Sequence, residues 1–173
     1  MKLVIVGNDG AGKSTLAKRL VQDFGLDSTA ISPLADYPRI MVARRYGYPL
    51  PLVYEKPTPA WLRKQLIDEC LSMEAEFGYD KTRQTILEFW VNRHGQKRNW
   101  VVDDCRYDLE VLAFRKLGAL VLHISHPPTG SQTGAYYDNI EGLAGLAHLH
   151  TTYDEVRKPA FYEKLREYVL CWD

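Results

Sequence analysis

The sequence predicts an α/β fold in which a five-stranded, mostly parallel sheet lies between two layers of helices. Short apolar runs typical of buried strands alternate along the chain with longer segments whose apolar residues recur at helical spacing. Neither an internal repeat nor a linker rich in Pro, Gly or Ser divides the 173 residues. That length suits one compact core. We therefore expect a single domain over residues 1–173 with a three-layer α/β/α arrangement.

The N-terminal segment carries the clearest strand and helix. Leu3-Val4-Ile5-Val6 is a continuous apolar run, typical of a strand buried on both faces, and we place a strand at residues 2–6. After a glycine-rich turn, apolar residues recur at helical spacing from Lys13 to about Phe24, and Gly25 is suited to end a helix there. The segment therefore predicts a strand, a loop and a helix in succession.

The rest of the chain continues this alternation. We expect further strands near residues 29–32, 100–102, 120–124 and 147–151. We expect helices near residues 34–46, 59–77, 81–93, 109–117 and 159–170. Pro and Gly mark residues 47–59 and 127–134 as irregular, and such segments often border binding sites.

Composition and charge argue against several classes of protein. Lysine plus arginine and aspartate plus glutamate number 22 each, so the net charge is zero and a large nucleic-acid-binding surface is not expected. We expect no membrane span, because no run of about 18 apolar residues occurs. Cys70, Cys105 and Cys171 are odd in number and widely spaced, which favours a reducing compartment. With no signal peptide ahead of the first strand, we expect a cytoplasmic protein.

The turn after the first strand carries a phosphate-binding motif. Gly7-Asn8-Asp9-Gly10-Ala11-Gly12-Lys13-Ser14 fits G-x-x-x-x-G-K-[ST], the P-loop, between a predicted strand and a predicted helix. Glycines let successive backbone N–H groups point at phosphate oxygens, and the helix start adds its positive dipole end. Lys13 can reach the β- and γ-phosphates, and the Ser14 hydroxyl can ligate Mg²⁺. The residues expected to bind the nucleotide are Gly10, Ala11, Gly12, Lys13, Ser14 and Thr15.

Charged residues follow the strand predicted at 100–102. Ligands of open parallel sheets bind beyond the carboxyl ends of the strands, so Asp103 and Asp104 are candidates to support Mg²⁺ or its waters. Alternatively, either aspartate could cap the N-terminus of the next helix instead of supporting a metal ion. Arg106 can stabilise a transferred phosphoryl group or hold an acceptor phosphate, and a surface salt bridge with Glu110 is its alternative.

Two segments resemble known kinases. Gly7 to Thr15 is similar to the P-loop of thymidylate kinases, which often reads G-x-D-G-A-G-K-S-T. Residues 100–124 are similar to phage-type deoxynucleoside monophosphate kinases, which carry D-x-R-x-x-x-E, then a helix ending in G-A and an apolar strand. Asp104, Arg106 and Glu110 fall on that pattern. The middle third of the chain carries no such resemblance.

The resemblance implies a P-loop NTPase-type kinase. Such an enzyme uses ATP and Mg²⁺ and transfers the γ-phosphoryl group of ATP to a deoxynucleoside monophosphate, giving the diphosphate. The resemblance implies Lys13, Arg106 and Asp104 as catalytic residues, Ser14 with Asp103 or Asp104 at the metal, and Arg106 at the acceptor phosphate. It also implies that Asp9 lies near the acceptor sugar hydroxyl, whereas a plain turn residue is its alternative reading.

The sequence departs from the thymidylate kinase pattern in its cations. Those enzymes place a catalytic arginine in the P-loop or in a mobile lid, but residues 126–147 contain neither Arg nor Lys. We still expect a lid at 126–146, because four glycines in that span favour mobility. We expect the helical region at about 34–95 to bind the acceptor. Five arginines of this region could supply the missing cation: Arg39, Arg44, Arg45, Arg63 and Arg83. Of these, we expect Arg44 and Arg63 to bind the substrate.

Two alternatives to this function stay open from the sequence. One is a P-loop kinase of another small acceptor, such as a nucleoside; the other is a regulatory nucleotide-binding module. A GTPase is disfavoured, because the guanine-reading N-K-x-D motif is absent from the sequence. The expected partner is a nucleoside monophosphate whose base the sequence does not identify. A homodimer is also considered, because related kinases are often dimers, and a phage-encoded chain would act in the host cytoplasm.

Overall fold

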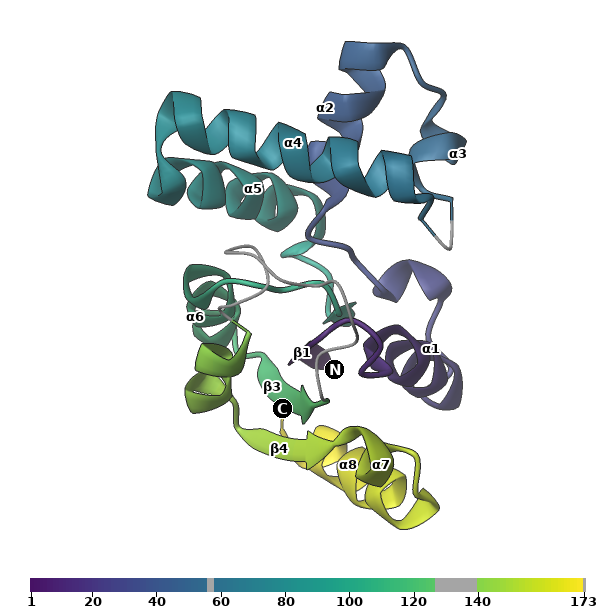
Figure 1. Ribbon diagram of the computed structural model, residues 1–173. Coiled ribbons are helices and arrows are strands. Elements are labelled where there is room, and N and C mark those ends of the chain that lie inside the picture. The colour runs from purple at the N-terminus through teal and green to yellow at the C-terminus, as the bar shows by residue number, and fades with distance from the viewer. Residues whose placement is uncertain (56–57, 127–139, 173) are drawn as a thin grey trace. The chain divides into compact units, whose positions relative to one another are not determined.

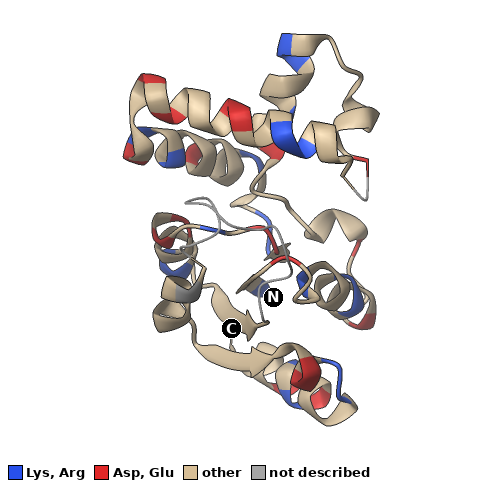
Figure 2. Cartoon of the chain, in the orientation of Figure 1, with Lys and Arg blue, Asp and Glu red and all other residues tan. Residues whose placement is uncertain are grey.

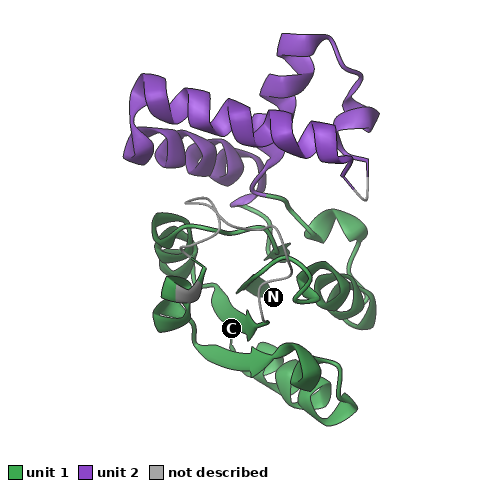
Figure 3. Cartoon of the chain, in the orientation of Figure 1, with its two compact units in different colours: residues 1–33, 96–173 green, residues 34–95 purple. Residues whose placement is uncertain are grey.

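The computed structural model describes residues 1–55, 58–126 and 140–172, and it divides the chain into two compact units. Unit 1 comprises residues 1–33 and 96–173, and unit 2 comprises residues 34–95 (Figure 3). Unit 1 contains the sheet and unit 2 is helical (Figure 1). None of the described helices combines the length and the apolar character that a membrane span requires.

The sheet of unit 1 is parallel throughout. It consists of β1 (Lys2–Gly7), β2 (Trp100–Val102), β3 (Leu120–Ser125) and β4 (Leu149–Thr152) in the order β2-β1-β3-β4 (Figure 1). Register pairs Val4 with both Val102 and Val121. The central strands β1 and β3 are buried along almost their whole length, which explains why their sequences are mostly apolar. The carboxyl ends of all four strands therefore lie at one edge of the sheet.

The prediction of a fifth strand at residues 29–32 is wrong. Residues Ser28–Ala30 form a short 3-10 helix, η1, and Ile31 alone makes an isolated parallel bridge to Val101. The Asp27 carboxylate accepts a hydrogen bond from the Thr29 backbone N–H at 2.7 Å, which caps this helical turn. Pro33 follows two residues after Ile31 and cannot donate to a ladder. The described residues therefore form a four-stranded sheet.

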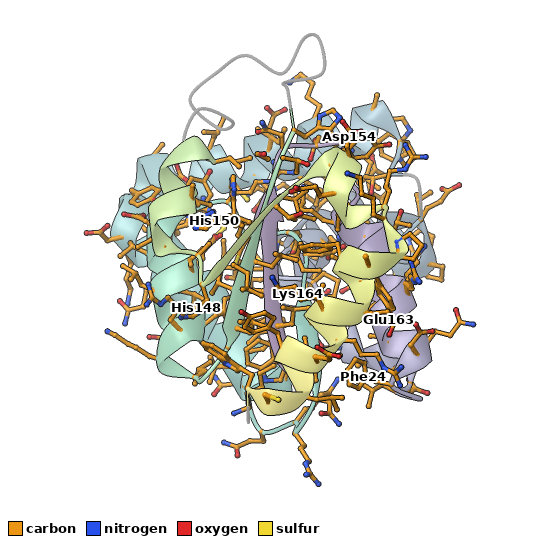
Figure 4. The ribbon with its side chains drawn as sticks, turned by 90° about the horizontal axis from the view of Figure 1, so that it is seen from below. Phe24, His148, His150, Asp154, Glu163 and Lys164 are labelled. Carbon is orange, nitrogen blue, oxygen red and sulfur yellow. The ribbon has the colours of Figure 1, made fainter. Side chains whose placement is uncertain are left out.

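Helices cover both faces of the sheet. On one face α1 (Lys13–Asp23) and α8 (Pro159–Cys171) bury apolar residues against Leu3, Ile5 and Leu122, and Figure 4 shows α8 lying across the strands. On the other face the ring of Phe114 in α6 (Asp108–Lys116) lies 5.5 Å from that of Trp100. Besides η1, the described part of unit 1 contains the short helices η2 (Glu141–Leu146) and α7 (Tyr153–Val156). The predicted helices near 13–24, 109–117 and 159–170 are confirmed within a few residues.

The described residues of unit 2 form four helices. They are α2 (Asp36–Tyr46), α3 (Leu50–Val53), α4 (Ala60–Phe77) and α5 (Tyr79–His94). Their apolar centre contains Val42, Ala43, Val53 and Leu62. Three of these helices are confirmed, and α3 differs from the expectation of an irregular segment at 47–59, which rested on Pro and Gly in that segment. Proline is tolerated in the first turn of a helix, and Pro51 stands there in α3.

Gly7, at the end of β1, provides a test of the close packing of β1 against β3. Gly7 has φ +150°, and a Cβ placed on it would lie 2.4 Å from the backbone oxygen of Ile124. Both strands are fixed in the sheet, so neither can give way. We expect Gly7→Ala to lower the free energy of unfolding by about 3 kcal/mol, measured by urea unfolding.

Gly25→Ala is the matched control. Gly25 also has a positive φ, +61°, but a Cβ there would meet no atom within 4 Å. Only the backbone preference then opposes alanine, at a cost of about 1 kcal/mol. Equal losses for the two variants would contradict close packing of β1 against β3.

Candidate functional site

The phosphate-binding motif lies where β1 ends and α1 begins. Gly12 is the N-cap of α1 with φ 83° and ψ 9°, a left-handed conformation that residues other than glycine rarely adopt. The loop is closed by a hydrogen bond from the Ala11 backbone N–H to the Asn8 carbonyl at 3.2 Å. Ser14 and Thr15 are exposed in the first turn of α1. Unpaired N–H groups at a helix start and exposed hydroxyls suit a phosphate and its metal ion.

Lys13 folds back over this loop. Its Nζ donates to the carbonyl oxygens of Gly7 at 2.7 Å and of Asn8 at 2.8 Å. The ammonium group is thus fixed at the loop by the backbone of the same motif. A phosphate oxygen accepts a stronger, charge-assisted hydrogen bond than a carbonyl does, so it can compete for this ammonium.

The surroundings of Lys13 lower its pKa from 10.5 to about 8. Burial, which disfavours the charged form, is the largest cause, and the positive charge of Arg106 acts in the same direction. The carboxylates of Asp9, Asp103 and Asp104 partly oppose this shift. The structure therefore brings together around Lys13 the four other charged residues that the sequence predicted for the site in unit 1.

Arg106 pairs with Asp9 across the site. Its Nη2 donates to Oδ1 of Asp9 at 3.0 Å, and each side chain is 18% exposed. The Glu110 carboxylate accepts from the backbone N–H of Arg106 at 2.9 Å and of Tyr107 at 3.2 Å, which caps the start of α6. Glu110 therefore orders the segment that carries Arg106, while the guanidinium itself reaches the P-loop.

Asp103 and Asp104 follow β2 directly. The N-cap of α6 is Tyr107, so the alternative that one of these aspartates caps that helix is wrong. Across residues 1–55, 58–126 and 140–172, no group of three or more His, Cys, Asp or Glu side chains could hold a metal ion alone. Hydroxyl and carboxylate oxygens are nevertheless the donors that Mg²⁺ prefers, usually together with phosphate oxygens and water. Ser14 with Asp103 and Asp104 therefore suits a magnesium ion that arrives with a nucleotide.

Cys105 lies in the same segment but is not suited to nucleophilic chemistry. It is buried, and burial together with the negative charges of Glu110, Asp104 and Asp103 raises the pKa of its thiol well above the usual value. Only the thiolate is nucleophilic, so Cys105 is a small buried side chain here.

Three further residues lie near the P-loop. The Asn8 side-chain amide donates to the His126 carbonyl at 2.9 Å, and the His126 ring packs edge-on against Tyr153 at 4.6 Å. A Cβ on Gly12 would lie 3.8 Å from the Tyr153 ring, so this ring borders the loop. The Arg157 guanidinium lies 5.2 Å from the centroid of the Tyr153 ring. No sequence motif marks these residues, because loops far apart in the chain bring them together.

The arginines proposed from the middle of the chain all lie in unit 2. Arg39 donates to the Val53 carbonyl, Arg45 pairs with Glu69 at 3.0 Å, and Arg83 pairs with Glu74. These three hold unit 2 together. Arg44, in the last turn of α2, and Arg63, in the first turn of α4, are exposed, and substrate binding by them stays a prediction. Residues 127–139 of the expected lid lie outside the described residues.

The chain was compared with solved structures and with known families. The chain is similar to the crystal structure of shikimate kinase from Aquifex aeolicus vf5, with a TM-score of 0.47 and 16% identity, over 99% of this chain and 95% of that one. No protein-family model matches the chain, and no curated protein matches its sequence. What can be said of the site therefore depends on its own residues.

The lowered pKa of Lys13 predicts proton uptake on ATP binding. Phosphates favour the charged ammonium, so binding raises the pKa again from about 8. Above pH 8 the free protein is partly neutral at Lys13 and must gain the proton, so ATP affinity falls as the pH rises. At about pH 8.5 we expect uptake of roughly half a proton or more, measured by calorimetry in buffers of different ionisation enthalpy.

Lys13→Arg is the control for this experiment. Its guanidinium stays charged throughout this range, so the binding enthalpy of the variant should not depend on the buffer. Buffer-independent enthalpy for the unmodified protein would mean that Lys13 is already fully charged, contrary to its burial.

Proposed function

We propose that this chain is a small kinase that transfers the γ-phosphoryl group of ATP to a (deoxy)nucleoside monophosphate. The observation that carries the proposal is the placement of Lys13 at a P-loop with Arg106 close by. A lysine at the loop suits the donor phosphates, and a guanidinium opposite it suits a second anionic substrate. The resemblance of the sequence to deoxynucleoside monophosphate kinases supports this class of acceptor.

Lys13 acts on the transferred group. Loop N–H groups hold the donor phosphates, and the ammonium stabilises the charge that spreads over the γ-phosphoryl oxygens during transfer. Ser14, with Asp103 and Asp104 nearby, would hold Mg²⁺, which neutralises charge on the donor phosphates when bound. These residues position the reactants and stabilise charge, and none needs to form a covalent intermediate.

Arg106 acts on the acceptor. It holds the acceptor phosphate so that one of its oxygens faces the γ-phosphorus. This oxygen is already ionised near neutral pH, so no protein base is required to remove a proton. In the free enzyme the Asp9 carboxylate holds the guanidinium in place at 3.0 Å. A dianionic phosphate offers Arg106 a bidentate partner of higher charge than Asp9 does.

Tyr153 and Arg157 act on the donor side. The tyrosine ring borders Gly12 of the P-loop, and the Arg157 guanidinium lies 5.2 Å from the centroid of that ring. Aromatic rings and guanidinium groups provide stacking surfaces for a nucleobase. We propose that this pair contacts the ATP molecule, whereas Arg106 contacts the acceptor.

A panel of acceptors tests the reaction class. We expect ADP production from Mg²⁺ and ATP to depend on an added nucleoside monophosphate, and Lys13→Ala to lower turnover by about 10²–10³-fold. Lys18→Ala, which removes an exposed lysine from the same helix, is the control and should keep full activity. ADP production indifferent to every acceptor, or near-normal turnover in Lys13→Ala, would reject the proposal.

A second experiment distinguishes the residue proposed to bind the acceptor from the residue proposed to bind ATP. Arg106→Ala should raise the KM for the acceptor at least about tenfold and leave the KM for ATP nearly unchanged. Arg157→Ala should raise the KM for ATP and leave that for the acceptor nearly unchanged. Circular dichroism of both variants serves to exclude misfolding. If Arg106→Ala weakened only ATP binding, the acceptor assignment would be incorrect.

A further inference from the structure

The outward face of α4 carries a coiled-coil-like stripe. Trp61, Lys64, Asp68, Leu71 and Ala75 follow one another at intervals of three, four, three and four residues, and all five are exposed. Trp61 is 47% exposed and Leu71 is 50% exposed. The opposite face of the helix is buried within unit 2. The stripe has the spacing of a coiled-coil seam, with a large apolar side chain near each end and two charged side chains between them.

The stripe is complementary to itself when reversed. Position 66 is midway between Lys64 and Asp68 and also midway between Trp61 and Leu71. In an antiparallel pair of helices centred at position 66, Lys64 faces Asp68 of the second copy, and both residues lie about 3 Å from the centre along their helix axes. Trp61 faces Leu71 of the second copy, and both lie about 7.5 Å from the centre. A parallel pair would instead place lysine against lysine and aspartate against aspartate. Only the antiparallel arrangement places opposite charges together at positions 64 and 68 and apolar side chains together at positions 61 and 71.

Charge on α2 and along α4 has the same polarity, with basic residues on α2 and toward the N-terminal end of α4 and acidic residues toward the C-terminal end of α4 (Figure 2). Residues 39–64 contain one acidic residue, Glu55, and residues 65–80 contain no basic residue. Among the described residues of the first segment, the exposed basic ones are Arg44, Arg45, Arg63 and Lys64. The exposed acidic residues of the second segment are Asp68, Glu76 and Asp80. An antiparallel pair of α4 helices therefore sets a basic half against an acidic half on both sides.

Trp61 is held by neighbouring rings. Its ring meets Tyr48 edge-on at 5.6 Å, and Tyr48 stacks with Tyr46 at 5.6 Å. Gln65 donates to the Tyr48 hydroxyl at 3.3 Å. Tyr46 is 48% exposed, so the apolar surface continues from Trp61 onto it. Fixed aromatic side chains lose little entropy on association and are frequent among the residues that dominate interfaces.

We propose that α4 is the interface of a homodimer, in which a second copy of this chain lies antiparallel on the Trp61–Leu71 stripe. In the single chain Lys64 and Asp68 pair with each other at 2.7 Å, with 77% and 53% of their side chains exposed. Such an exposed pair contributes little to stability. In the dimer the two copies form a four-membered network of alternating charge, which fixes the register. The proposal does not depend on the activity proposed above.

Charge reversal in the full-length chain tests this arrangement. Sedimentation velocity over a hundredfold range of concentration should show a dimer for the unmodified protein. Lys64→Asp leaves only negative groups at the two central positions, and Asp68→Lys leaves only positive ones. Each variant alone should be monomeric, with dimerisation weakened about a hundredfold or more. An equimolar mixture of the two variants should restore the dimer, because opposite charges then meet only between chains.

The mixture distinguishes an ion pair between two chains from the ion pair between Lys64 and Asp68 within one helix. Neither variant can form its own 64–68 ion pair, so recovery in the mixture requires contact between two chains. Lys164→Asp, which reverses an exposed charge on α8 (Figure 4), should leave the dimer unchanged. A monomeric unmodified protein, single variants that stay dimeric, or a mixture that stays monomeric while circular dichroism shows folded helices would each overturn the proposal.

Discussion

The candidate site depends on a lysine ammonium that its own loop fixes in a poorly solvated place. Lys13 donates to two carbonyl oxygens of the P-loop, and burial lowers its pKa to about 8. A buried cation is costly unless it has partners, and the carboxylates of Asp9, Asp103 and Asp104 supply part of that compensation. Bound phosphates would supply more. The same placement that makes the free ammonium less stable therefore favours an anionic ligand.

The parallel sheet makes this cluster possible. Because β1 and β2 pair in parallel, with Val4 beside Val102, the segments that follow them leave the sheet at the same edge. Asp9 and Arg106 are 97 residues apart in sequence, yet this topology brings their side chains within 3.0 Å. Glu110 adds local order by accepting two backbone N–H groups at the start of α6. The position of Arg106 thus follows from strand pairing and from a helix cap together.

Local patterns were sufficient to predict much of unit 1. The P-loop and the strands at β1, β2 and β3 follow from short runs of sequence, because glycine spacing and apolar runs act within a few residues. The prediction of a strand at 29–32 was wrong because the Asp27 carboxylate accepts a hydrogen bond from the Thr29 N–H, which starts a helical turn. The Asp9–Arg106 pair and the Tyr153 ring beside Gly12 arise from contacts between distant segments, which no local pattern reports. Arg39, Arg45 and Arg83 resembled ligand-binding residues by type, whereas their structural partners lie within unit 2.

The most direct measurement of the central claim is a crystal structure with magnesium and a non-hydrolysable ATP analogue. The account predicts the triphosphate along the backbone N–H groups of Gly10 to Ser14. It also predicts that Lys13 Nζ leaves the Gly7 and Asn8 carbonyls, now 2.7 and 2.8 Å away, for a β- or γ-phosphate oxygen. Nucleotide bound elsewhere, with Lys13 still on its own carbonyls and the loop empty, would contradict it.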